Sequence, residues 1–269
     1  MAFLPTPSSS VGPPWAVLPR HLQAWALETF GSKMLTLMLE NSATVKACIR
    51  GKPHECKQHA TFHVSALDSV TKVRSELHHQ SWRGYNTSLP DEGGVLVDIG
   101  GNLGIVAVTT VLRNPGCVRV LSVEPNPETL VFLRWNLWEN HISELNSMKR
   151  IGCGVLPVNA ALTNDGRNIS LQVGARAMNA HIEGAVSPYD DKFDAIGGEN
   201  DPVRARRGKV EAKSAFRKYT VSSFTLESLV SRYDLQHAAA DILKLDCEGC
   251  VHTQPSPLRG LSQRLARAW

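Results

Sequence analysis

The chain has 269 residues, of which 42% are hydrophobic and 20% charged, and its formal net charge is +4. This length accommodates one α/β domain with extensions, and the composition is that of a globular protein, which excludes fibrous and wholly disordered classes. No apolar run approaches the roughly 18 residues of a membrane-spanning helix, and the mild positive charge does not argue for nucleic acid. We therefore expect neither a membrane span nor a nucleic-acid partner.

The first 60 residues read as an N-terminal extension of mixed character. Residues 1–18 are rich in proline and serine, and we expect disorder there. Residues 19–40 carry apolar side chains at helical spacing, but Gly31 interrupts the pattern, which therefore fits one helix or two short ones. Residues 41–60 have no clear period, residues 61–65 alternate like a short strand, and residues 67–80 fit a helix.

From residue 95 onward, strand and helix patterns alternate. Short runs that indicate strands lie at residues 95–99, 118–123, 155–158, 169–173, 219–222 and 241–246. Helical patterns lie at residues 103–112, 127–140 and 226–233, and Asn126 is placed to cap the second of these helices. Residues 174–218 read as a polar insertion. This order predicts a doubly wound, mostly parallel Rossmann-like α/β sheet.

The six cysteines are spread along the chain and do not have the density of a disulfide scaffold. We expect them to be mostly reduced and the protein to be intracellular, in the cytoplasm. Residues 1–20 contain no acid, which leaves an organellar transit segment open. His54, Cys56, His59 and His63 match no zinc-site spacing, and we interpret them as exposed polar residues.

The run from Val95 to Gly104 is the most informative segment. It predicts a buried strand that leads through a glycine-rich turn into a helix. Glu124 ends the next strand, 20 residues after Gly104, and an acid at this distance binds ribose hydroxyls in Rossmann-type sites. The spacing therefore predicts a cofactor that contains a nucleoside.

The glycine loop follows the pattern Asp-x-Gly-x-x-x-Gly and not the Gly-x-Gly-x-x-Gly of dinucleotide sites. Asp98 would place a carboxylate where a pyrophosphate binds, which is electrostatically unfavourable. A cofactor that carries positive charge and no phosphate suits this loop better, and S-adenosylmethionine has a sulfonium and an ammonium group. An NAD-dependent oxidoreductase is the weaker alternative.

Three segments together resemble the motifs of the FkbM-type methyltransferase family. They are Val97-Asp-Ile-Gly-Gly-Asn-Leu-Gly104, Val123-Glu-Pro-Asn-Pro127 and Ile242-Leu-Lys-Leu-Asp-Cys-Glu-Gly249. The resemblance covers residues 61–250, and its Lys-x-Asp-x-Glu-Gly motif discriminates best. It implies a class I methyltransferase fold and S-adenosylmethionine-dependent methyl transfer to a hydroxyl of a small-molecule or glycan acceptor.

By position in these motifs, the resemblance implies a cofactor site made of Asp98, Gly100, Asn102, Gly104, Glu124, Asn126, Asn159 and Ala160. It also implies that the reacting end is formed by Lys244, Asp246 and Glu248. Asp246 is our first choice for orienting the acceptor or taking its proton, and Glu248 is the second. A structural ion pair at a strand end is the alternative for these three residues.

The chain departs from the family after Gly249. Val251 stands where the family has a glutamate, and only 23 residues follow Asp246. The strands and helices that the family has beyond this point need at least roughly 40 residues. We therefore expect a C-terminal half that is truncated or replaced, with residues 251–269 as a divergent tail. This tail supports a second alternative, a degenerate methyltransferase-fold protein without catalysis.

Overall fold

The computed structural model describes residues 13–50, 55–65, 89–149, 152–173, 180–182, 217–235 and 240–245. The helices are η1 (Pro14–Val17), α1 (Arg20–Glu40), α3 (Ile105–Arg113), α4 (Pro127–Glu139) and α7 (Leu226–Arg232). The strands are β1 (Ser42–Arg50), β2 (Gln58–Ser65), β3 (Gly93–Ile99), β4 (Cys117–Val123), β5 (Gly154–Val158), β6 (Ala161–Leu162), β7 (Ile169–Val173), β8 (Ala180–Ile182), β9 (Arg217–Val221), β10 (Ser223–Phe224) and β11 (Ile242–Leu245). The helix expected at residues 67–80, most of the polar insertion and the whole tail from residue 246 lie outside the described residues.

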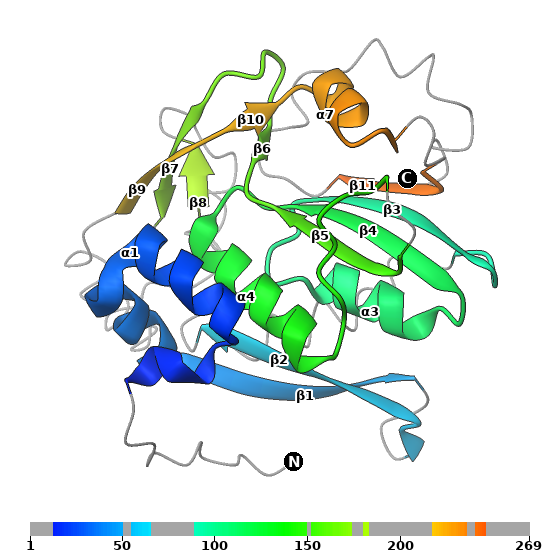
Figure 1. Ribbon diagram of the computed structural model, residues 1–269, viewed down its shortest axis with the longest axis horizontal. Coiled ribbons are helices and arrows are strands. Elements are labelled where there is room, and N and C mark those ends of the chain that lie inside the picture. Colours follow the sequence, from blue (N-terminus) through cyan, green and yellow to red (C-terminus); the bar gives the residue numbers. More distant parts are fainter. Residues whose placement is uncertain are drawn as a thin grey trace, which may run out of the picture.

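Four parallel strands form the central sheet, in the order β11-β3-β4-β5. Helices α3 and α4 connect β3 to β4 and β4 to β5 and cover one face, while α7 lies on the opposite face (Figure 1). A parallel sheet needs such crossover helices, because after each strand the chain must return to the end of the sheet at which the next parallel strand begins. The expected α/β class, with a parallel sheet flanked by helices, is confirmed.

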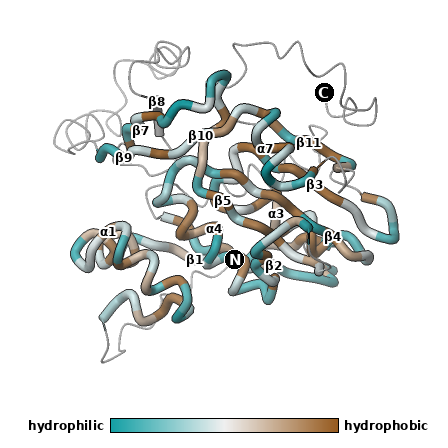
Figure 2. The backbone as a smooth tube through the Cα atoms, turned by 45° about the horizontal axis from the view of Figure 1, so that its top comes forward, coloured by the Kyte–Doolittle hydropathy of each residue, from teal (hydrophilic) through white to brown (hydrophobic). Residues whose placement is uncertain are grey.

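Side chains of the central sheet alternate between two buried clusters. Leu96 and Val120 belong to the cluster that includes residues of α3 and α4, whereas Val97 and Leu121 belong to the cluster that includes residues of α7. Because both faces are buried, the strands have nearly continuous apolar sequences. Figure 2 shows brown, hydrophobic stretches along these strands. This two-sided burial explains why the sequence pattern located them.

The N-terminal part packs beneath the helices of the sheet. Gly31 has φ 71° and ψ 163° inside α1, so the helix is broken there into two halves, one of the two expected arrangements. Strands β1 and β2 form an antiparallel hairpin on the outer side of α3 and α4 (Figure 1). The expected boundary at residue 60 falls within β2. Residues 41–60 were expected to have no clear period, and this is wrong for β1: its apolar residues alternate at Ala43, Val45, Ala47 and Ile49, of which Val45 and Ile49 are buried and the two alanines are partly buried.

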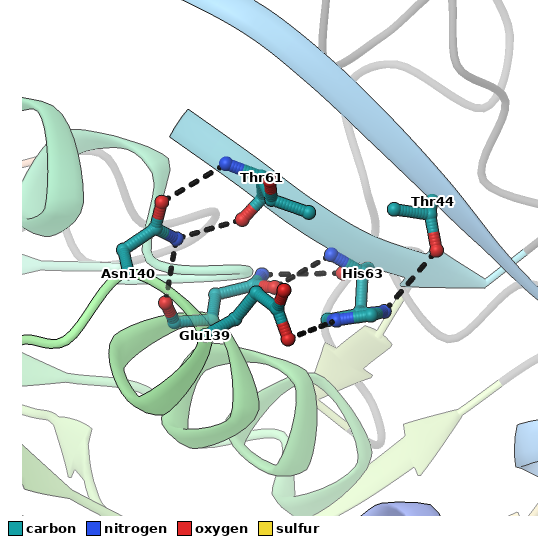
Figure 3. A network of polar contacts seen from close by, with 6 residues as sticks. Thr44, Thr61, His63, Glu139 and Asn140 are labelled. Carbon is teal, nitrogen blue, oxygen red and sulfur yellow. Dashed lines mark hydrogen bonds and ion pairs between the residues drawn. The ribbon is translucent and has the colours of Figure 1, made fainter. Parts of the chain in front are cut away.

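Asn136 of α4 and Asn140, which caps the C-terminus of that helix, pair with the outer edge of β2. Asn140 accepts from the N–H of Thr61 at 2.9 Å and donates to its carbonyl at 2.7 Å (Figure 3). Asn136 makes the same two bonds with the backbone of His63, at 2.6 and 3.1 Å. Asn136 also donates to the carbonyl of Leu103 at 2.9 Å. These amides satisfy an otherwise open strand edge and join the hairpin to the glycine loop.

His63 is a packed residue and not an exposed polar one. Its ring stacks on Trp135 with centroids 3.6 Å apart, and its Nε2 lies 3.2 Å from a carboxylate oxygen of Glu139. Burial lowers the pKa of His63 below its ordinary value, while Glu139 opposes this change. The expectation of an exposed side chain is therefore wrong for His63. Within the described residues, no cluster of side chains suits a metal ion.

A small antiparallel sheet, in the order β8-β7-β9, lies beside the N-terminus of α4. Glu128, in the first turn of α4, connects the two parts. Its buried carboxylate accepts two hydrogen bonds from the guanidinium of Arg217 and one, at 2.8 Å, from the hydroxyl of Tyr219. This bidentate pair anchors β9 to the central domain.

Two disulfides contradict the expectation that the cysteines are reduced. Cys48–Cys56 closes the β1–β2 hairpin, and Cys117–Cys153 joins the starts of the neighbouring strands β4 and β5. None of the described cysteines is free. The pairing removes the basis for the expected cytoplasmic location, because disulfides persist in oxidising compartments. Among the described helices, none combines the length and apolar character needed to cross a bilayer.

Candidate cofactor site

The glycine loop joins β3 to α3 through a sequence of left-handed residues. Gly100 has φ 82° and Gly104 has φ 79°, conformations that side chains rarely adopt. A Cβ atom on Gly104 would also lie 2.9 Å from Cγ of Leu133 in α4. The N–H groups of Gly100 and Gly101 donate to the carbonyl of Val123, which ties the loop to the end of β4. Gly104 is therefore required by its left-handed conformation and by its packing against α4, and Gly100 by its left-handed conformation.

Glu124 lies at the carboxyl end of β4, next to the loop. Its Oε2 accepts from the N–H of Asn102 at 2.7 Å, and its Oε1 accepts from the N–H of Asn126 at 2.8 Å. Burial raises the pKa of Glu124 above its usual value, and the two backbone donors oppose that rise. The carboxylate is thereby fixed in orientation between the loop and the start of α4, as an acid that binds two adjacent hydroxyls must be.

Asn102 carries a buried polar atom without a partner. Its backbone is in the left-handed region, with φ 48°. Its Oδ1 is buried and has no hydrogen-bond partner among the residues that the structure describes. Leaving a buried acceptor unpaired costs about 1–3 kcal/mol, so such an atom indicates a site for a donor group of a ligand or of an ordered water molecule. The orphaned oxygen and the fixed carboxylate of Glu124 belong to adjacent parts of one site, because Asn102 itself donates to Glu124.

Asp98, Lys244 and Ser122 lie in one row across three strands. The strand register pairs Lys244 of β11 with Asp98 of β3, and Asp98 with Ser122 of β4. Lys244 Nζ lies 2.8 Å from Asp98 Oδ1 and donates to the carbonyl of Gly100 at 3.1 Å, and the hydroxyl of Ser122 lies 3.4 Å from Asp98 Oδ2. Asp98 is completely buried and Lys244 nearly so. The pair supports the base of the loop.

This ion pair changes the electrostatic interpretation of Asp98. From the sequence, the carboxylate of Asp98 was expected to be an uncompensated negative charge that faces the cofactor. In the structure the ammonium of Lys244 neutralises that charge at 2.8 Å, so Asp98 by itself does not disfavour phosphate. The ion-pair alternative for Lys244 agrees with these contacts, because the side chain ends at Asp98 and Gly100.

The other expected cofactor residues brace the segment that carries Glu124. Asn126 caps α4, its Oδ1 accepting from the N–H of Glu128 at 3.0 Å. Asn159 donates to the carbonyls of Glu124 and Pro125, at 2.9 and 3.0 Å. Ala160, which follows Asn159 in the sequence, is buried in the cluster that includes residues of α7. The structure thus brings the expected cofactor residues together around the ends of β3, β4 and β5.

Two residues of this site were not anticipated from the sequence. Ser122 is a polar residue in an otherwise mostly apolar strand, and this is the sequence signal that could have identified it; its register with Asp98 is visible only in the structure. Thr129 is buried in the first turn of α4, and its hydroxyl donates to the carbonyl of Asn126 at 3.0 Å. The expected residues Asp246 and Glu248 lie outside the described residues. No protein family, curated protein or solved structure matches the chain.

Proposed function

We propose that the chain is an S-adenosylmethionine-dependent methyltransferase that acts on a hydroxyl oxygen of a small-molecule or glycan acceptor. The observation that carries the proposal is the carboxylate of Glu124, which two backbone N–H groups hold at 2.7 and 2.8 Å next to the glycine loop. A ribose offers two adjacent hydroxyl donors to such a carboxylate. The resemblance of the motifs in the loop, after β4 and at β11 to those of FkbM-type methyltransferases favours S-adenosylmethionine as the cofactor.

The residues present fit a nucleoside cofactor. Glu124 supplies two oriented acceptor oxygens, and the orphaned Oδ1 of Asn102 supplies a third acceptor for an N–H or O–H group. The glycine conformations at Gly100 and Gly104 let a ligand approach the backbone closely. Lys244 holds the loop through Asp98 and the carbonyl of Gly100. Hydrogen bonds fix the carboxylate of Glu124 and the ammonium of Lys244 before a ligand binds, which reduces the entropy lost on binding.

Methyl transfer requires little further chemistry from the protein. The sulfonium of the bound cofactor supplies an activated methyl group, so the protein mainly aligns the acceptor oxygen and excludes water. Asp246, which follows the last residue of β11 directly in the sequence, is our choice for the group that takes the acceptor proton. Asp246→Asn should then lower the methylation rate while leaving cofactor binding intact.

A nicotinamide dinucleotide remains the second candidate, and one observation favours it. Because Lys244 neutralises Asp98, the loop base does not repel a pyrophosphate, and a ribose would bind Glu124 in the same way. Thermal unfolding with each ligand separates the two candidates. At 100 times its Kd a ligand stabilises the folded state by about 2.7 kcal/mol. Stabilisation by S-adenosylmethionine and not by NAD supports the proposal, and the reverse pattern overturns it. Stabilisation by neither indicates the degenerate protein.

A further inference from the structure

The two disulfides indicate the compartment in which this chain folds. Cys117 and Cys153 are both exposed and are joined to each other at the amino ends of β4 and β5. Thiol–disulfide exchange requires access to the sulfur atoms, and the reducing systems of the cytosol open accessible disulfides. Cys48–Cys56 is a second pair in a different part of the fold. Two independent pairs are typical of proteins that mature in an oxidising, secretory compartment.

A modification motif of the same compartment lies on the surface. Asn168-Ile169-Ser170 has the form Asn-x-Ser with no proline at the middle position, which is the acceptor motif for N-linked glycans. Asn168 is exposed in the loop that leads into β7. A second match, Asn86-Thr-Ser88, lies outside the described residues.

The fold keeps Asn168 at the surface while fixing the residues on both sides of it. Ser223 donates to the carbonyl of Arg167, and Arg167 pairs with Asp165 in the preceding turn. On the other side, Ile169 packs against the cluster of Leu171 and Val173. A glycan on Asn168 would therefore extend from an anchored loop and displace no core residue.

We propose that Asn168 is an N-glycosylation site of this protein. In the transfer, a bond forms between Nδ2 of Asn168 and C1 of an oligosaccharide, and the bond between C1 and the pyrophosphate oxygen of a lipid-linked donor breaks. The lipid pyrophosphate leaves with the electron pair, and the amide proton passes to a base of the transferase and then to solvent. No oxidant or reductant takes part, and the proposal is independent of the cofactor.

The direct test is peptide mapping of the full chain isolated from the cells that make it. Enzymatic removal of N-linked glycans converts a glycosylated asparagine to aspartate, so the peptide that contains residue 168 should carry aspartate after treatment. The same digest, run without reductant, should contain the Cys117–Cys153 pair. An unmodified Asn168, or modification at Asn86 alone, overturns the proposal.

Variants of the full chain, produced behind a secretory leader in a eukaryotic host, test the motif itself. Ser170→Ala should abolish the glycan at Asn168, whereas Ser170→Thr, which preserves the motif in a strand position, should retain it. Asn164→Gln is the matched control, because Asn164 is exposed in the same loop but belongs to no such motif. A glycan that persists in Ser170→Ala, or its absence in both serine variants, contradicts the assignment.

Discussion

Replacing Lys244 by methionine tests whether the Lys244–Asp98 pair supports the glycine loop. The ammonium lies 2.8 Å from a carboxylate that is completely buried, so the variant removes the cation from a buried anion. Removing one partner of such a pair typically costs roughly 3–5 kcal/mol. Each kcal/mol lowers the Tm of a chain of this size by about 2–4 °C, so we expect a decrease on the order of 10 °C in thermal unfolding.

Two further variants make this measurement specific. Lys149→Met removes a cation from an exposed pair, in which the Lys149 and Asp234 side chains are 61% and 32% exposed and 3.8 Å apart, and an exposed pair contributes at most about 1 kcal/mol. The double variant Lys244→Met with Asp98→Asn removes both charges and should recover part of the lost free energy of unfolding. A Lys244→Met protein as stable as Lys149→Met would contradict the role given to the pair. So would a double variant whose loss equals the sum of the two single losses.

Three other perturbations follow from the described contacts. Glu128→Gln breaks the bidentate pair with Arg217, and we expect a loss of about 2–3 kcal/mol together with faster proteolysis near β9; unchanged proteolysis would argue against the anchoring role. Burial raises the pKa of Glu124 above its ordinary value of 4.5. The contribution of Glu124 to stability is therefore largest below pH 4.5 and is lost as the pH rises through the raised pKa. The unliganded wild type should thus lose stability relative to Glu124→Gln as the pH rises from about 4.5, and parallel pH profiles of the two proteins would refute this. Replacing Cys117 and Cys153 by serine removes a disulfide that closes a loop of 36 residues, which should lower the free energy of unfolding in urea by about 4 kcal/mol. A decrease below about 1 kcal/mol would mean that the disulfide adds little stability.

The central sheet could be predicted from the sequence because its strands are buried on both faces. The run of residues 95–99, which is apolar except for Asp98, therefore appears as a nearly continuous apolar segment. Strand β1 lies half exposed in an antiparallel hairpin, and its apolar residues alternate at Ala43, Val45, Ala47 and Ile49, a period-2 pattern that the expectation for residues 41–60 missed. Arg113 of α3 also holds the strand by donating to the carbonyl of Ile49, which is a tertiary contact. Such tertiary bonds leave no local period.

The residues of the candidate site could be proposed from the sequence, but the contacts that fix them could not. Glu124 occupies the expected strand end, and its carboxylate orientation depends on backbone N–H groups that no sequence pattern encodes. The pairing of Lys244 with Asp98 depends on which strand lies next to β3, and that is a property of the sheet order. The disulfide between Cys117 and Cys153 likewise requires β4 and β5 to be neighbours. Long-range adjacency therefore limits what the sequence alone can assign.

The most direct test of the proposed site is calorimetric titration of S-adenosylmethionine into the wild type and two variants. Glu124→Ala removes the carboxylate that would bind the ribose, and each hydrogen bond to a charged group contributes about 1.5–3 kcal/mol, so we expect binding to weaken by roughly 10²-fold or more. Glu227→Ala, an exposed acid on α7, should bind as the wild type does. Equal affinity in the wild type and Glu124→Ala, or no binding to a folded wild type, would contradict the proposed site.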